Sequence, residues 1–254
     1  MLALNDKWVV ITRPEHQTEN LQLKLEAVGA HSILFPLIEI APPNDPALMK
    51  EQLANLLAYD VVIFVSANAV EQSFHWVNSS ILKNIKVATT GKKTAEALQR
   101  KEIAIEFCPE KIFNSEALLA MPDFKAFCVD KKIAIIRGEG GRNLLRDELL
   151  QTAASVDYIN VYQRQCPQNS LSVLEGKAQQ GELDIILLTS GTSVENFFSL
   201  VKNEKWIDQL ILLLGSPRMQ KKIPESFQGK LLVAEDPSDE TLFKKLTAIF
   251  NKTK

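Results

Sequence analysis

Two serine-containing segments, each placed after an apolar run, are the first candidates for a binding site. Ser66-Ala-Asn follows the strand-like segment 60–65, and Ser190-Gly-Thr follows the segment 184–189. A serine in this position can cap the next helix, and the unpaired N–H groups in the first turn of that helix can bind an anion. Simple capping, which is worth about 1 kcal/mol, would explain the same residues. The residues alone leave both interpretations open.

The glycine-rich segment Arg137-Gly-Glu-Gly-Gly-Arg142 resembles a phosphate-binding loop, although its spacing matches neither the dinucleotide-binding motif nor the P-loop. Two arginines that flank glycines at the end of a strand could bind a carboxylate through paired hydrogen bonds. A surface turn with solvated charges is the alternative.

Tyr162 lies in the alternating segment Tyr158–Arg164, between two halves that look globular. Its hydroxyl can donate or accept a hydrogen bond while its ring packs, and a purely structural strand aromatic is the alternative. An upstream counterpart, residues 34–40, also ends near prolines. These two segments suggest that the chain crosses from one lobe to another and later crosses back, with Tyr162 facing a cleft.

The other reactive residue types point to no further catalytic site. The histidines His16, His31 and His75 are scattered, and no spacing indicates a metal site or a catalytic triad. The three cysteines are odd in number and unclustered, which is typical of buried thiols in a reducing cytosol. We therefore expect no metal, no cofactor and a cytoplasmic location.

Length and composition indicate a two-domain globular protein. The chain has 254 residues, of which 46% are hydrophobic and 24% charged, and single domains usually have about 100 to 200 residues. The net charge of −2 argues against a nucleic-acid partner, because no general positive field would attract a polyanion. We see no signal peptide, and the longest apolar runs are far shorter than a membrane span, so we expect no membrane association.

The candidate residues follow a recurring order of strand, loop and helix. This order begins with an apolar run at 7–11, a helical pattern at 18–28 closed by Gly29, and an extended segment at 32–40. The other predicted strands are 60–65, 87–91, 103–108, 132–136 and 184–190, and the other predicted helices are 49–57, 93–98, 114–119 and 144–150. Such alternation predicts α/β architecture with parallel sheets covered by helices, and ligand sites beyond the carboxyl ends of the strands.

The second half of the chain repeats the first at an offset of 124 residues. Within residues 60–74 five positions are identical at this offset, where average composition predicts about one. The matched pairs are Asp60 with Asp184, Ser66 with Ser190, Val70 with Val194, Glu71 with Glu195 and Phe74 with Phe198. We infer an internal duplication.

In their order and spacing, the motifs resemble the uroporphyrinogen-III synthase family, whose members cyclise hydroxymethylbilane in tetrapyrrole (heme) biosynthesis. The resemblance covers nearly the whole chain. It rests on Ile11-Thr12-Arg13-Pro14, Phe64-Val-Ser66-Ala67-Asn68-Ala-Val70, Gly91-Lys-Lys-Thr94-Ala95, residues 137–142, Val161-Tyr162, Leu188-Thr189-Ser190 and residues 235–242. Without it, a non-catalytic two-lobed small-molecule binding protein and a nucleotide-sugar transferase would be the alternatives.

The resemblance implies two similar α/β lobes joined by a two-stranded β ladder. Lobe 1 would comprise residues 1–35 and 169–254, the ladder residues 36–43 and 158–168, and lobe 2 residues 44–157. It also implies a monomeric lyase without a cofactor, with the preceding pathway enzyme as a candidate partner.

The implied reaction is loss of water from the hydroxymethyl group, inversion of the last pyrrole ring through a spiro intermediate, and closure of the macrocycle. Because the substrate also closes unaided to the uninverted isomer, positioning matters more than acid catalysis. By resemblance, Tyr162 assists departure of the hydroxyl. The residues expected to bind the eight substrate carboxylates are Thr12, Arg13, Ser66, Ala67, Asn68, Gly91, Thr94, Arg137, Arg142, Ser190, Gly191, Thr192 and Gly215.

Two features leave parts of this set open. Arg13, Arg137 and Arg142 could brace the loops instead of binding substrate. The family often has Thr-Ala where this chain has Arg218-Met219, the pattern kept in the first copy at Thr94-Ala95. A charge at Arg218 would then replace a hydroxyl contact.

Overall fold

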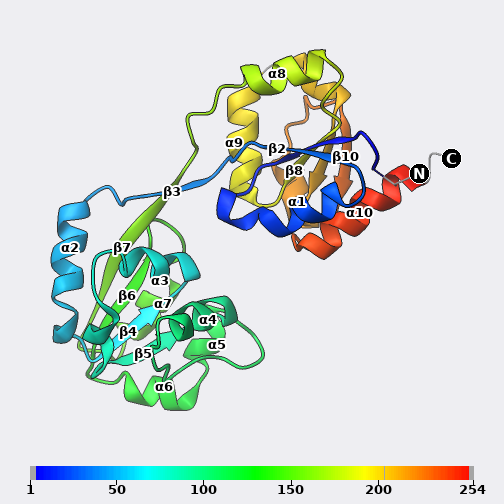
Figure 1. The fold of residues 1–254 in the computed structure, drawn as a ribbon. Coiled ribbons are helices and arrows are strands. Elements are labelled where there is room, and N and C mark those ends of the chain that lie inside the picture. Colours follow the sequence, from blue (N-terminus) through cyan, green and yellow to red (C-terminus); the bar gives the residue numbers. More distant parts are fainter. Residues whose placement is uncertain (1–3, 203, 252–254) are drawn as a thin grey trace. The chain divides into compact units, whose positions relative to one another are not determined.

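This computed structural model describes residues 4–202 and 204–251. Within them, short apolar strands form two five-stranded sheets (Figure 1). The chain divides into unit 1, Met1–Glu39 with Gln165–Lys254, and unit 2, Ile40–Arg164. The boundary falls inside β3 (Glu39–Ala41) and at the last residue of β7 (Ser155–Gln165). Both positions lie within the segments expected to form the ladder.

The sheet of unit 1 has the order β10-β9-β8-β1-β2, with each neighbouring pair parallel. Its strands are β1 (Trp8–Ile11), β2 (His31–Leu34), β8 (Ile185–Leu188), β9 (Ile211–Leu214) and β10 (Lys230–Val233). Helices α1 (Glu19–Glu26) and α10 (Asp239–Asn251) pack on one face, and α8 (Ser172–Gln179) and α9 (Gly191–Val201) pack on the other. The central strands are apolar at every position because both of their faces are covered.

The sheet of unit 2 has the order β3-β7-β6-β4-β5, and the strands from β7 to β5 are parallel. Its other strands are β4 (Val61–Phe64), β5 (Lys86–Thr89) and β6 (Lys132–Gly138). Val62 and Phe64 pack under α2 (Pro46–Ala54), α3 (Ala67–Ser73) and α4 (Lys92–Arg100). Val61 and Ile63 face α5 (Ser115–Leu119), α6 (Pro122–Phe127) and α7 (Leu144–Leu149). Short 3₁₀ helices complete the two units at Glu15–Gln17, Leu56–Ala58, Ser79–Leu82, Lys205–Gln209 and Pro217–Lys222.

The α/β class and the parallel sheets are confirmed, whereas two predicted strands need correction. The predicted strand 103–108 is wrong: only Phe107 forms an isolated bridge, to Ala88, and Pro109 then supplies no N–H for further pairing. The extended segment 32–40 is interrupted between β2 and β3, where Pro36 likewise lacks an N–H. Gly29 ends its helix with φ 77°, as its position predicts.

The matched aspartates Asp60 and Asp184 make equivalent contacts. The Asp184 carboxylate accepts the N–H of Trp8 at 2.9 Å and pairs with Lys7 at 2.6 Å. The Asp60 carboxylate accepts the N–H of Lys132, also at 2.9 Å. In both sheets, therefore, an aspartate just before one strand holds the start of the neighbouring strand. This identity between the two halves has a structural reason.

We expect Asp184→Ala to lower the free energy of unfolding by about 1–3 kcal/mol, because the partly buried N–H of Trp8 at the start of β1 loses its acceptor. Asp184→Asn should lose less, since an amide oxygen can still accept from Trp8. Urea unfolding of the two variants measures the difference. Equal losses in both would show that the charge of the Lys7 pair, and not the acceptor, supplies the stability.

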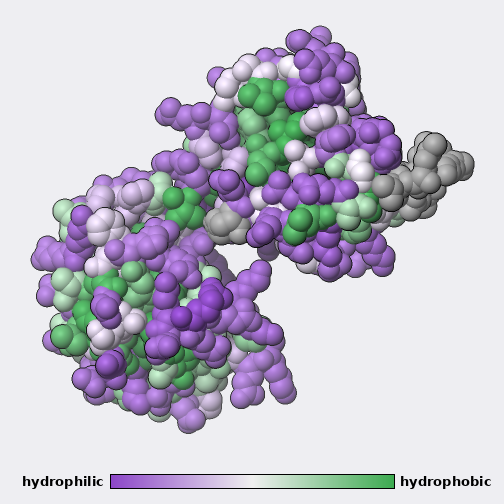
Figure 2. All heavy atoms as spheres, in the orientation of Figure 1, coloured by the Kyte–Doolittle hydropathy of each residue, from purple (hydrophilic) through white to green (hydrophobic). Residues whose placement is uncertain are grey.

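Hydrophilic residues cover most of the face drawn in Figure 2, and hydrophobic residues appear between them. Within residues 4–202 and 204–251, no helix is both long enough and apolar enough to cross a membrane.

Candidate functional site

The predicted site residues lie near the carboxyl ends of strands or in the first turn of the following helix. In unit 1 they form a group that we call strand-end surface 1, which consists of Thr12, Arg13, Ser190, Gly191, Thr192 and Gly215. In unit 2 they form strand-end surface 2, which consists of Ser66, Ala67, Asn68, Gly91, Thr94, Arg137, Arg142 and Tyr162. Because neighbouring strands in each sheet are parallel, their carboxyl ends share one edge.

Ser66 on strand-end surface 2 has two roles in the structure. Its Oγ accepts the N–H of Ala69 at 3.1 Å and so caps α3, as predicted. The same oxygen lies 3.2 Å from Tyr162 Oη, within hydrogen-bond distance. The first-turn amides of Ala67 and Asn68 have no hydrogen-bond partner among the described residues. Capping is therefore present, and two amides remain available for an acceptor.

The amino end of α4 carries positive charge where a helix normally prefers negative charge. Gly91 is the cap and offers no side chain, and Lys92 and Lys93 occupy the exposed first turn, which contains no acidic residue. Thr94, the next residue, is only 4% exposed, and its hydroxyl has no partner within residues 4–202 and 204–251. Lysines at a helix amino terminus repel the partial positive charge there, so this arrangement is unfavourable for the helix itself and suits a bound anion.

Tyr162 is the most enclosed member of strand-end surface 2. Its side chain is 2% exposed and belongs to the core under α3 and α4, so the expectation that it faces an open cleft is wrong. Its ring passes directly over Gly138, where a Cβ atom would lie 2.9 Å from the Tyr162 hydroxyl and closer still to the ring carbons. A register shift between Arg137 and Gly138 brings about this approach. Arg164 donates from Nη2 to Tyr162 Oη at 3.0 Å.

Arg137 braces its own loop. It is 8% exposed, and it donates from Nε to the Gly138 carbonyl at 3.1 Å and from Nη1 to the Arg142 carbonyl at 3.2 Å. Its guanidinium carbon lies 4.4 Å from the ring centroid of Tyr158. Gly141, with φ 87°, has no room for a side chain beside the Arg137 guanidinium. Of the two alternatives for this arginine, the structure supports bracing.

Arg142 is exposed and forms a two-pronged ion pair with Glu116. The hydrogen bond from Arg142 holds the pKa of the Glu116 carboxyl below its usual value. An exposed pair of this kind contributes little stability, and the arginine can exchange partners at small cost.

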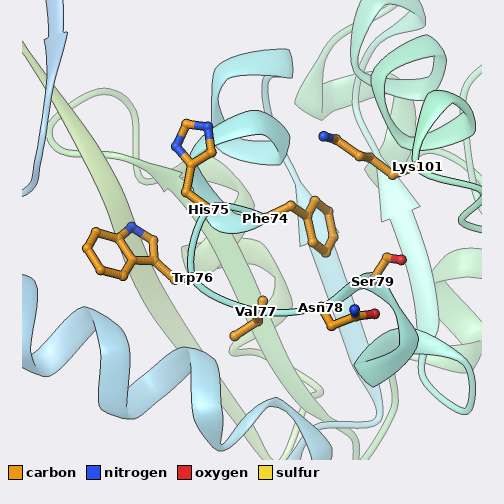
Figure 3. A pocket seen from close by; sticks show the side chains of 7 residues that line it. All are labelled: Phe74, His75, Trp76, Val77, Asn78, Ser79 and Lys101. Atoms are coloured by element: carbon orange, nitrogen blue, oxygen red, sulfur yellow. The ribbon is translucent and has the colours of Figure 1, made fainter.

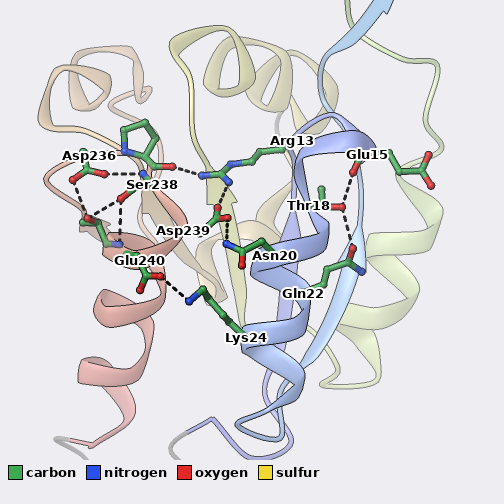
Figure 4. A network of polar contacts seen from close by, with 12 residues as sticks. Arg13, Glu15, Thr18, Asn20, Gln22, Lys24, Asp236, Ser238, Asp239 and Glu240 are labelled. Carbon is green, nitrogen blue, oxygen red and sulfur yellow. Dashed lines mark hydrogen bonds and ion pairs between the residues drawn. The ribbon is translucent and has the colours of Figure 1, made fainter. Parts of the chain in front are cut away.

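Arg13 on strand-end surface 1 is also engaged within its own unit (Figure 4). It donates to the Asp239 carboxylate and to the Pro237 carbonyl, at the start of α10. Asn20 donates to the second oxygen of Asp239 at 2.6 Å. Near by, hydrogen bonds from Ser238 lower the pKa of the Asp236 carboxyl. This network ties α1 to α10, so Arg13 serves as a brace.

Two of the three side-chain hydroxyls of strand-end surface 1, those of Thr12 and Ser190, are likewise used by the fold. Thr12 is 1% exposed and donates to the Leu187 carbonyl at 2.5 Å. Ser190 and Ser193 form a reciprocal capping box at the start of α9, with each N–H 3.0 Å from the other's Oγ. Thr192 is exposed, and its side chain has no partner within the described ranges.

Of two glycines on strand-end surface 1, only Gly215 is required by close packing. A Cβ atom at Gly191 would lie 2.8 Å from Cε of Lys222, whose ammonium group pairs with Glu195. A Cβ atom at Gly215 would lie 2.9 Å from Pro237. The end of the Lys222 side chain can move aside at Gly191, whereas Pro237 cannot at Gly215, so only Gly215 has a packing reason for being glycine.

The loop that departs from the family pattern has Arg218 exposed and Met219 buried, 3% exposed. It forms the 3₁₀ helix Pro217–Lys222, and Arg218 has no ion-pair partner among the described residues. The positively charged side chain of Arg218 therefore occupies the position that corresponds, at the offset of 124 residues, to Thr94 and its hydroxyl.

Elsewhere in unit 2, a hollow of about 370 Å³ lies beyond the carboxyl end of α3 (Figure 3). Its lining residues are Phe74, His75, Trp76, Val77, Asn78, Ser79 and Lys101. None of them is a predicted site residue, and the hollow is distinct from strand-end surface 2.

The cysteines are poor candidates for nucleophiles. Cys128 is buried as predicted, and burial raises its pKa to about 12. Cys108 and Cys166 are only partly buried, which corrects the prediction, and burial raises the pKa of both thiols as well. A raised pKa leaves little of the reactive thiolate at neutral pH. In the part of the chain that the structure describes, no three potential metal ligands lie together.

The sequence interpretation missed Arg164 and Gly138, which contact Tyr162 directly. The signal for Arg164 was available, because residues two apart on a strand share a face. The signal for Gly138 was not, because its contact depends on the register shift.

Known proteins resemble this chain over almost its whole length. The family model described as uroporphyrinogen-III synthase HemD matches residues 19–244. The uroporphyrinogen-III synthase of Escherichia coli K12 is 28% identical, over 94% of this chain and 99% of that protein. The Salmonella typhimurium enzyme is 29% identical over the same shares.

Solved structures agree in fold. The uroporphyrinogen-III synthetase of Helicobacter pylori 26695 superposes with a TM-score of 0.59 at 14% identity, over 96% of this chain and 99% of that one. A mutant synthase from Thermus thermophilus gives 0.58 at 16% identity over the same shares. Since the family model spans most of the chain, the chain belongs to the uroporphyrinogen-III synthase family.

Proposed function

We propose that this cyclising lyase binds the carboxylates of hydroxymethylbilane at its two strand-end surfaces while converting it to uroporphyrinogen III. The amino end of α4 carries this proposal. Lys92 and Lys93 in its first turn, together with the unpartnered Thr94 hydroxyl, make a place for an anion in a protein of net charge −2. Of the other expected contacts, the amides of Ala67 and Asn68 are the most available.

The set of carboxylate-binding residues that we propose gives Arg13 and Arg137 a smaller role than the sequence-based expectation did. Ser66, Thr94 and Ser190 with neighbouring amides remain its centre. Arg13 and Arg137 act through the loops that they brace, since their guanidinium groups already have carbonyl or carboxylate partners. Arg142 and Arg218 are exposed and able to contact substrate.

Tyr162 is proposed to assist the loss of water. Its phenol would donate a proton to the departing hydroxyl, so that water leaves before the last pyrrole ring inverts through the spiro intermediate. The proton that this ring loses when the macrocycle closes would return to the phenolate. The contacts of Tyr162 Oη with Ser66 and Arg164 support this role, because they fix the direction of the O–H group. The protein's larger contribution is to hold the substrate in the conformation that leads to inversion.

We also propose that the architecture arose by duplication, with two similar lobes joined by a ladder formed from residues 36–43 and 158–168. The strand orders support this. At the offset of 124, β9-β8-β1-β2 of one sheet corresponds to β5-β4-β6-β7 of the other. We further propose a cytoplasmic monomer that works without a metal or cofactor and receives its substrate from the preceding enzyme; the three free cysteines suit a reducing compartment.

Incubation with freshly prepared hydroxymethylbilane, followed by separation of the product isomers, tests the activity. We expect isomer III to predominate, whereas a reaction without protein gives isomer I by unaided closure. The same product as in that blank would contradict the proposal. Tight binding of a sugar or nucleotide would then favour the binding-protein or transferase alternatives.

A further inference from the structure

Arg164 stands out among the arginines near the carboxyl ends of the strands because of its partner. Arg13, Arg137 and Arg142 donate to carbonyl or carboxylate oxygens. Arg164 is exposed and donates instead to a phenol, Tyr162 Oη, at 3.0 Å. Its guanidinium carbon also lies 5.4 Å from the centroid of the Tyr162 ring. No carboxylate pairs with it in residues 4–202 and 204–251.

This contact restricts where the Tyr162 proton can point. An arginine only donates hydrogen bonds, so Arg164 must occupy an acceptor position of the phenol oxygen. The phenol O–H is therefore directed away from Arg164, toward Ser66 Oγ at 3.2 Å or toward a ligand acceptor that replaces it. Ser66 Oγ is itself held by the Ala69 N–H at 3.1 Å, so the group on that side of the phenol has a defined position.

The positive charge of Arg164 also favours proton transfer from the Tyr162 phenol. When the phenol gives its proton to a departing hydroxyl, negative charge develops on the phenol oxygen. A guanidinium already at hydrogen-bond distance stabilises that charge without reorganisation. The ring cannot move away on its other side, because it packs against Gly138.

We propose that Arg164 is a positioning residue for the dehydration step, which acts through Tyr162 by orienting its O–H group and stabilising the charge left on its oxygen. This inference rests on the proposed role of Tyr162. It predicts that substitution of Arg164 changes kcat rather than KM, and that the change depends on the presence of the Tyr162 hydroxyl.

The kinetic test is a double-mutant cycle with Arg164→Gln and Tyr162→Phe. Arg164→Gln should lower kcat for isomer III about tenfold with KM nearly unchanged, and should have little further effect in the Tyr162→Phe background. Arg164→Lys, which keeps a charged donor, should recover part of the loss. Arg100→Gln is the matched control, because it removes an exposed arginine that pairs with Glu71 far along α4. A rise in KM at constant kcat, or an equal effect in both backgrounds, would overturn the proposal.

A second measurement separates this proposal from the proposed activity. The protein has three tyrosines, so ¹³C labelling at the tyrosine ring carbon that bears the hydroxyl gives few resonances to assign. The Tyr162 resonance should shift in Arg164→Gln and stay in place in Arg100→Gln. An unshifted resonance would refute the contact even in an active enzyme. Isomer I alone from the unsubstituted protein would instead refute the activity, whatever the resonance does.

Discussion

Gly138→Ala is expected to lower the free energy of unfolding by about 1–3 kcal/mol and to slow isomer III formation at least tenfold. A Cβ atom at this position would lie 2.9 Å from the Tyr162 hydroxyl and closer to the ring, a separation that real Cβ atoms do not adopt. The ring fills the core under α3 and α4, so it cannot yield without moving its neighbours. The phenol would then leave its position beside Ser66 and Arg164.

Two further variants isolate the cause. Gly176→Ala makes the same change inside α8, where nothing lies within 4 Å of the added methyl group, and should be neutral or slightly stabilising. In Gly138→Ala/Tyr162→Leu the smaller side chain relieves the clash, so part of the stability should return while activity stays low. Urea unfolding and initial rates of isomer III formation measure both effects. Wild-type activity in Gly138→Ala would show that the Tyr162 position is unimportant.

The sequence predicted which candidate residues lie after the strands more reliably than it predicted their contacts. Ser66 and Ser190 cap helices after buried strands, as their order in the chain predicts, because a cap depends on residues three apart. Asp60 and Asp184 are one of the five pairs that match at the offset of 124, and their equivalent contacts give a structural reason for that one identity. Local patterns of this kind can be recognised from the sequence alone, and they locate the carboxyl ends of the strands.

The residues that the candidate site side chains contact could not be predicted from the sequence in the same way. Arg137 and Arg142 flank the same glycines, yet one is buried against a carbonyl and the other is exposed beside Glu116. The burial of Tyr162 depends on a register shift after Arg137, which no local pattern indicates. The predicted strand at 103–108 failed although the edge strand β5 has free backbone groups, because Pro109 has no N–H to continue the pairing that Phe107 begins.

Removal of the Tyr162 hydroxyl is the most direct test of the proposed chemistry. Tyr162→Phe keeps the ring that packs on Gly138, so the fold should remain, with a loss of about 1 kcal/mol from the hydrogen bonds to Ser66 and Arg164. The dehydration step would lose its proposed proton donor, and we expect kcat for isomer III to fall about 10- to 100-fold. Because unaided closure continues at its own rate, the fraction of isomer I in the product should rise.

Tyr158→Phe provides the matched control for this test. It makes the same change on the same strand, and its hydroxyl contacts Asn143 at 3.3 Å, away from Ser66 and Arg164. Rates and isomer ratios in Tyr158→Phe should match those of the unsubstituted protein. If Tyr162→Phe behaved in the same way, Tyr162 would have only a packing role, and the protein would direct inversion by binding alone. The isomer ratio decides between these outcomes, because a protein that only binds substrate correctly would keep isomer III predominant without the phenol.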